Sequence, residues 1–113
     1  MAGDPLGEIT VSKTAMDKQR RYLTASQLRD ALRNAYGRVH RRTSPNHDGL
    51  YPQNKFVFRG TFHGKDIDIV FVVEDDQTTV ITQMSQHVDS LQGRYYEQVG
   101  TSASEAIANM PAE

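Results

Sequence analysis

The sequence predicts an α+β domain in which two N-terminal helices pack on an antiparallel β-meander of three or four strands, followed by a short C-terminal helix. Three observations support this fold class. Helical periodicity is concentrated in residues 13–37, two alternating apolar segments flank a glycine-containing turn at 64–65, and a β-branched segment follows at 78–85. An antiparallel sheet of this kind buries one face against its helices and leaves the other face open.

The length of 113 residues, with 37% hydrophobic and 24% charged residues, is typical of one soluble globular domain. We expect an N-terminal arm at 1–7, the α+β domain at 8–85, and a C-terminal extension at 86–113 that carries the short helix. The absence of cysteine excludes disulfides and thiolate chemistry. The longest apolar run, 69–73, is too short to span a bilayer, and residues 1–7 do not resemble a secretory signal. These features predict a cytoplasmic protein with no membrane partner.

The helices are predicted from caps and apolar spacing. A short edge strand at 8–12 precedes a first helix at 13–22. The second helix begins after the capping-box spacing Thr24–Gln27 and should end at Gly37 in a left-handed conformation. Its apolar stripe consists of Leu28, Ala31, Leu32, Ala35 and Tyr36. A second capping-box spacing, at 102–105, predicts the C-terminal helix, which Pro111 should close.

The β-meander is predicted from alternation. Segments 55–63 and 66–73 flank Gly64–Lys65, which favours a type II′ hairpin turn. That turn places Phe58 opposite Phe71 and puts the large apolar residues of both strands on one face. The next strand, 78–85, should add Val80, Thr82 and Met84 to this buried face. Residues 38–43 form a candidate fourth strand.

The net charge of −1 conceals an asymmetry between the two halves of the chain. The segment 13–65 carries a net charge of +9, and the segment 66–113 carries −8. A basic half favours a polyanion such as RNA as the ligand, because clustered cations release counterions when they meet phosphates. The alternative is that the two halves interleave in space and neutralise each other.

Two groups of side chains carry candidate chemistry. The open face of the meander should present Arg59, Thr61, His63, Asp68 and Gln83. Arginine can clamp a phosphate, and histidine can transfer a proton near neutral pH, so this face suits phosphodiester chemistry. Alternation in the 38–43 strand places Arg38, His40 and Arg42 together as a second phosphate-binding stripe. Both groups also fit solvated, functionally inert surfaces.

The sequence contains no motif for metal binding, nucleotide binding or nucleophilic catalysis. The four histidines lack HExxH or His-x-His spacing, and nucleotide-binding glycine patterns and the nucleophile elbow are absent. We therefore expect no metal and no cofactor.

Four stretches of the sequence, 9–16, 20–32, 55–73 and 79–83, together resemble the RelE/BrnT-like small domains of the barnase–EndoU–colicin–RelE ribonuclease group. The resemblance covers about residues 8–85 and rests on loose hydrophobic patterns. It implies a two-helix, twisted-sheet fold whose exposed face cuts RNA without a metal. Many relatives have a histidine in the first helix where this chain has Thr14, a departure that favours a non-cleaving relative as the alternative.

The residues and the resemblance together nominate a site. Candidate catalytic residues are His63, His40 and Arg59, and candidate RNA- or phosphate-binding residues are Arg20, Arg21, Arg38, Arg42, Thr82 and Gln83. The expected function is RNA binding, and the most specific prediction is metal-independent endoribonuclease activity. The alternative is a non-catalytic, phage- or plasmid-borne protein-binding module, an inhibitor or adaptor. Its partner would be a protein such as an antitoxin or an inhibited target.

Overall fold

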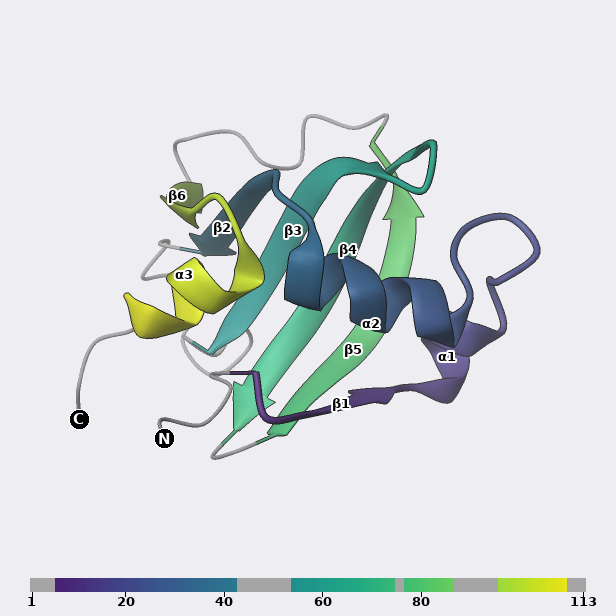
Figure 1. Cartoon of the computed structure of the whole chain (residues 1–113), viewed down its shortest axis with the longest axis horizontal. Helices are drawn as coiled ribbons and strands as arrows, with labels where there is room; N and C mark the ends of the chain where they lie inside the picture. Colours follow the sequence, from purple (N-terminus) through teal and green to yellow (C-terminus); the bar gives the residue numbers. More distant parts are fainter. Residues whose placement is uncertain (1–5, 43–53, 75–76, 87–95, 110–113) are drawn as a thin grey trace.

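The computed structural model describes residues 6–42, 54–74, 77–86 and 96–109. Six strands in these ranges form one sheet with the order β1-β5-β4-β3-β2-β6 (Figure 1). The strands are β1 (Glu8–Val11), β2 (Arg38–Arg42), β3 (Lys55–Phe62), β4 (Lys65–Glu74), β5 (Gln77–Ser85) and β6 (Tyr96–Gly100). The helices are α1 (Lys13–Met16), α2 (Ala25–Asn34) and α3 (Ala103–Ala108). β1 pairs with β5 in parallel, and the other pairings in this sheet are antiparallel.

The predicted fold class is wrong. The chain forms a six-stranded mixed sheet with short helices, and not two N-terminal helices on an antiparallel meander of three or four strands. The sheet is larger because β2 joins the free edge of β3, and β6 then joins β2. β6 lies in 86–113, where the apolar pattern is weak. The sheet becomes mixed because the N-terminal strand runs parallel to β5, a pairing across about 70 residues that local periodicity does not encode.

The first helix is shorter than predicted, ending at Met16 and not at Tyr22. Ser12 caps its start by accepting a hydrogen bond from the Ala15 amide, but only Ala15 in this helix is buried. The following residues are polar and exposed or half-buried, so no apolar stripe holds a longer helix against the sheet. None of the helices in the described ranges has the length and apolar character needed to cross a bilayer.

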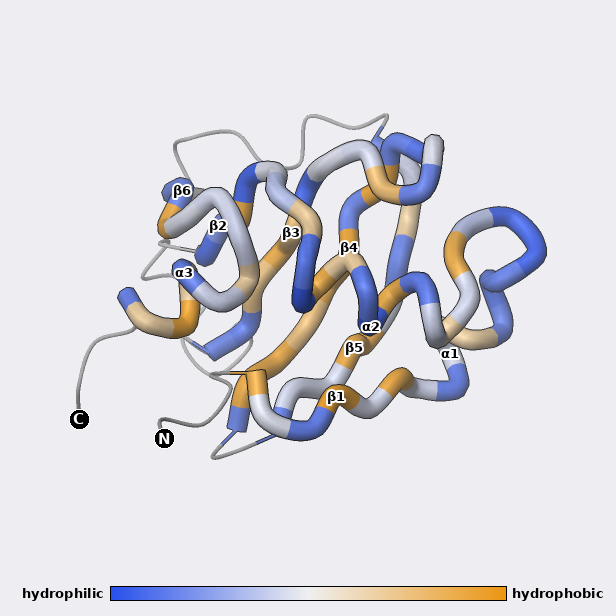
Figure 2. The backbone as a smooth tube through the Cα atoms, in the orientation of Figure 1, coloured by the Kyte–Doolittle hydropathy of each residue, from blue (hydrophilic) through white to orange (hydrophobic). Residues whose placement is uncertain are grey.

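α2 and α3 cover the same face of the sheet (Figure 1). The predicted capping box of α2 is present, with Thr24 accepting from the Gln27 amide and Gln27 accepting from the Thr24 amide. The buried side chains of the two helices join the apolar residues of the sheet in one core. Figure 2 shows hydrophobic residues along the central strands that α2 crosses, and hydrophilic residues in the segment that follows α1.

The β3–β4 hairpin has the predicted faces but a different register. The turn is His63–Gly64, whose φ angles of 52° and 80° are both positive, as a type I′ turn requires. Phe71 therefore lies opposite Phe56, with the ring centroids 5.3 Å apart, and not opposite Phe58. The register differs from the predicted one by two residues, and an even shift leaves each side chain on its expected face.

β5 departs from the prediction by changing faces halfway along. Phe71 pairs with Val80, but the preceding residue Val70 pairs with Thr82, so Ile81 is an extra residue in a β-bulge. Beyond the bulge the two faces are exchanged. Gln83 is fully buried on the helix side, whereas Met84, which we expected in the core, is 39% exposed.

Candidate functional site

A pocket of about 440 Å³ lies where β2 begins and β3 ends. Its lining comes from the α2–β2 connection, from the two strands and from the residue after β5. The lining residues are Tyr36, Gly37, Arg38, Arg59, Gly60, Thr61 and Gln86. The pocket therefore combines an aromatic ring, two guanidinium groups, a hydroxyl and an amide beside two residues without side chains.

The two glycines let the backbone segments around the pocket approach closely. A Cβ atom on Gly37 would lie 2.4 Å from the Arg59 carbonyl oxygen, and one on Gly60 would lie 2.7 Å from the Phe62 ring. Gly37 was expected to end the helix in a left-handed conformation, but α2 already ends at Asn34 and Gly37 has no positive φ. Its role is to bring the start of β2 against β3.

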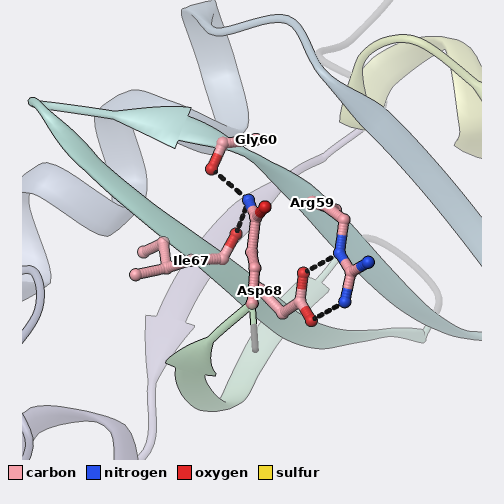
Figure 3. Close-up of polar contacts among 5 residues, drawn as sticks. Arg59, Gly60, Ile67 and Asp68 are labelled. Atoms are coloured by element: carbon pink, nitrogen blue, oxygen red, sulfur yellow. Dashed lines mark hydrogen bonds and ion pairs between the residues drawn. The ribbon is translucent and has the colours of Figure 1, made fainter. Parts of the chain in front are cut away.

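Arg38 and Arg59 are paired in register across β2 and β3, so both side chains lie on the face opposite the helices. Arg59 forms a bidentate ion pair with Asp68, with its Nε and Nη2 atoms 2.8 and 2.9 Å from the carboxylate oxygens (Figure 3). The Asp68 side chain is 4% exposed. Arg38 is exposed, and within the described ranges it takes part in no ion pair. The Arg59 charge is thus matched by Asp68, whereas the Arg38 charge is not matched by an ion pair among the described residues.

The aromatic ring in the lining belongs to Tyr36, which is 77% exposed. We expected Tyr36 on the buried stripe of the second helix. Because the helix ends two residues earlier and Ala35 is extended, Tyr36 does not continue the stripe. Burial of such a large side chain is normally favourable, so a highly exposed ring at the mouth of a pocket indicates a surface available for contact.

Gln86 is fixed in position by two main-chain acceptors. Its amide nitrogen donates to the Gly60 carbonyl at 2.7 Å and to the Ile67 carbonyl at 3.1 Å. These two bonds also determine the orientation of the amide, because only the nitrogen can donate to carbonyl oxygens. Sequence analysis did not identify Gln86, since it lies just past the predicted strand in a weakly patterned segment.

The two candidate catalytic histidines do not line the pocket. His40 is two residues from Arg38 on β2, and its Nδ1 atom is buried with no hydrogen-bond partner among the described residues. Burial, followed by the nearby Arg59 charge, lowers the pKa of His40, so its imidazole is neutral at pH 7. His63 lies in the β3–β4 turn, with its Nε2 atom 3.2 Å from a carboxylate oxygen of Asp30 on α2.

The remaining predicted binding residues lie elsewhere. Arg20 and Arg21 are exposed in the segment between α1 and α2, and Arg42 ends β2. The Thr82 hydroxyl accepts a hydrogen bond from the Lys18 ammonium at 2.8 Å. Of the nine nominated residues, the pocket contains Arg38 and Arg59. In the described part of the chain, no three His, Asp or Glu side chains are grouped as metal ligands would be.

Gln83, expected on the open face, has a structural role. Its amide nitrogen donates to the carbonyls of Ala15 and Leu23, and its amide oxygen accepts from the Leu23 amide at 2.9 Å. The side chain thus satisfies three backbone groups of the segment around the end of α1 and the start of α2. A fully buried amide whose two ends both bond the main chain is not accessible to a ligand.

The open face is also less open, and less basic, than expected. Asp68 and Val70 on the central strand β4 are 3% and 7% exposed although they lie opposite the helices. The charged halves of the chain interleave, because Arg59 pairs with Asp68 and Arg41 pairs with Glu97. Part of the basic charge of the 13–65 segment is therefore neutralised by acidic residues of the 66–113 segment.

Comparison of the chain with protein families, with curated proteins and with solved structures found no match.

Proposed function

We propose that this chain binds single-stranded RNA through the pocket between β2 and β3. The observation that carries the proposal is the exposed Tyr36 ring beside the exposed Arg38 guanidinium at one pocket. An aromatic ring on which a base can stack, next to a cation that can hold a phosphate, is the combination that single-strand binding uses.

Neither Tyr36 nor Arg38 takes part in an ion pair among the described residues, so both side chains are available to a ligand. Arg38 takes part in no ion pair with another described residue, so its charge can meet a phosphate. Arg59 contributes differently, because Asp68 holds its guanidinium in place and neutralises its charge. We assign phosphate binding to Arg38 and assign to Arg59 the shaping of the pocket wall.

We propose RNA binding at this pocket, and not RNA cleavage. Cleavage of RNA without a metal needs a general base and a general acid within reach of the phosphate. Neither His40 nor His63 lines the pocket, and His63 is paired with Asp30. Ribonuclease activity stays a prediction, which incubation of the protein with RNA in EDTA would test.

Fluorescence anisotropy with a labelled, mixed-sequence 12-nucleotide RNA tests the proposal. Arg38→Ala should weaken binding about tenfold, since a charge-assisted hydrogen bond contributes roughly 1.5–3 kcal/mol. It should also reduce the slope of log Kobs against log salt by about 0.7, the value for one phosphate contact on a single strand. Tyr36→Ala should weaken binding by roughly fivefold or more through loss of stacking.

The matched control is Arg20→Ala, which removes the same charge from an exposed position that does not line the pocket. It should change the affinity less than twofold. Absence of RNA binding by the parent protein at low salt would contradict the proposal and favour the protein-binding alternative. An equal loss in Arg20→Ala and Arg38→Ala would show that binding does not use the pocket.

A further inference from the structure

Two side-chain oxygen atoms in the pocket lining can only accept hydrogen bonds. The first is Oε1 of Gln86. Both protons of this amide are directed at the Gly60 and Ile67 carbonyls, and among the described residues no donor reaches the oxygen. The amide cannot rotate to offer a proton to a ligand without breaking two bonds to the main chain. Gln86 therefore presents a fixed acceptor to the pocket that it lines.

The second acceptor is Oγ1 of Thr61. The Thr61 hydroxyl donates its one proton to a carboxylate oxygen of Asp66, its cross-strand partner on β4. An ionised carboxylate has no proton to offer, so the direction of this bond is determined. The hydroxyl oxygen is left with lone pairs only. Thr61 was expected to contribute to the open face as a polar residue, but its pairing makes it an acceptor.

We infer, on the basis of the proposed RNA binding, that this pocket selects guanine over the other bases. Guanine carries two adjacent donors, N1–H and the N2 amino group, which can meet the two acceptor oxygens. Uracil has a single N–H donor, and adenine and cytosine each have a single amino group. Base discrimination therefore rests on the two acceptor oxygens, while Arg38 in the same lining is left to hold a phosphate.

The preference can be measured with four 9-nucleotide RNAs that are uridine throughout except for a central guanosine, inosine, adenosine or uridine. The central guanosine should raise the affinity about tenfold over uridine. Inosine lacks the N2 amino group but keeps N1–H, O6 and N7, so it should lose about fivefold relative to guanosine. This intermediate value assigns the selectivity to the donor edge of the base.

Two variants connect the preference to the acceptors. Thr61→Val keeps the shape of the side chain and removes the oxygen, and Gln86→Met removes the amide at similar length. Each should reduce the guanosine-to-uridine ratio at least threefold while the all-uridine RNA still binds. The matched control is Gln98→Met, the same change on an exposed β6 side chain that does not line the pocket, and it should keep the ratio of the parent.

The outcomes separate this inference from the proposed function. If none of the four RNAs binds the parent protein at low salt, the proposed function fails and the inference fails with it. If all four bind equally, RNA binding stands and guanine selection is overturned. If guanosine is preferred and both variants keep the full ratio, the assignment of the acceptors to Thr61 and Gln86 is overturned.

Discussion

The two hairpins that share β4 differ in how regularly their side chains alternate between the two faces of the sheet. In the β3–β4 hairpin, eight residue pairs run without interruption from Phe62–Lys65 to Lys55–Val72. In the β4–β5 hairpin, the register shifts at Val70 and Phe71, where Ile81 is inserted. Side chains therefore alternate regularly along β3, whereas those of β5 exchange faces halfway.

The difference shows what a bulge contributes to this fold. The short α1 leaves the backbone N–H and carbonyl of Leu23 without helical partners, and Leu23 is fully buried. A regular β5 would direct Met84 to this place. The bulge instead turns Gln83 inward, and its amide bonds both Leu23 groups and also donates to the Ala15 carbonyl. A regular strand would leave the two Leu23 groups unsatisfied, at a cost of about 1–3 kcal/mol for each buried group.

The largest expected change in stability is at Phe71, which lies in the core on the central strand that both hairpins share. Phe71 pairs with Phe56 on one side and with Val80 on the other, and it is fully buried. Phe71→Ala should lower the free energy of unfolding by about 3–5 kcal/mol, because it removes a core aromatic ring and leaves a cavity. Urea denaturation followed by circular dichroism measures the loss.

The control for Phe71 is Ile81→Ala, which truncates the inserted residue of the bulge. Ile81 is 36% exposed, so its truncation should cost less than about 1 kcal/mol. A loss at Ile81 equal to that at Phe71 would mean that β5 is regular and directs Ile81 into a packed environment.

The second effect tests the exchange of faces itself. Gln83→Leu should lower the free energy of unfolding by about 1–3 kcal/mol, since it leaves the buried N–H and carbonyl of Leu23 without partners. Met84→Gln, at the neighbouring exposed position, should change it by less than about 0.5 kcal/mol. The opposite ranking in denaturant titrations would place Met84 in the core and Gln83 outside.

Local signals were sufficient where the fold depends on local rules. The capping box predicted the start of α2, and alternation predicted the faces of β3 and β4. The same signals could not predict β2 as an interior strand, because four of its five residues are charged or histidine and only Val39 supplies apolar burial. Nor could they predict the parallel pairing of β1 with β5, which depends on contacts distant in sequence.

The residues of the candidate site that lie within strands were predictable, and those that lie just past the ends of elements were not. Arg38 and Arg59 follow from strand alternation, and the structure places both in the pocket lining. Tyr36 and Gln86 follow the ends of elements, where a shift of one or two residues changes the direction of the side chain. Gln83 was misplaced because a single inserted residue at Ile81 reverses the alternation on which its position was predicted.

The smallest expected effect distinguishes the two possible turns of the β3–β4 hairpin. In the structure, His63 occupies the first turn position with φ of 52°, and Lys65 begins β4. Asn–Gly is the preferred pair for this turn, so His63→Asn should raise the free energy of unfolding by about 0.5 kcal/mol. Lys65→Asn should lower it by a similar amount, because Asn is a poor strand residue and the Lys65 ammonium donates to the carbonyls of Arg21 and Tyr22. Reversed signs for the two variants would instead support a turn at Gly64–Lys65, with Phe58 opposite Phe71.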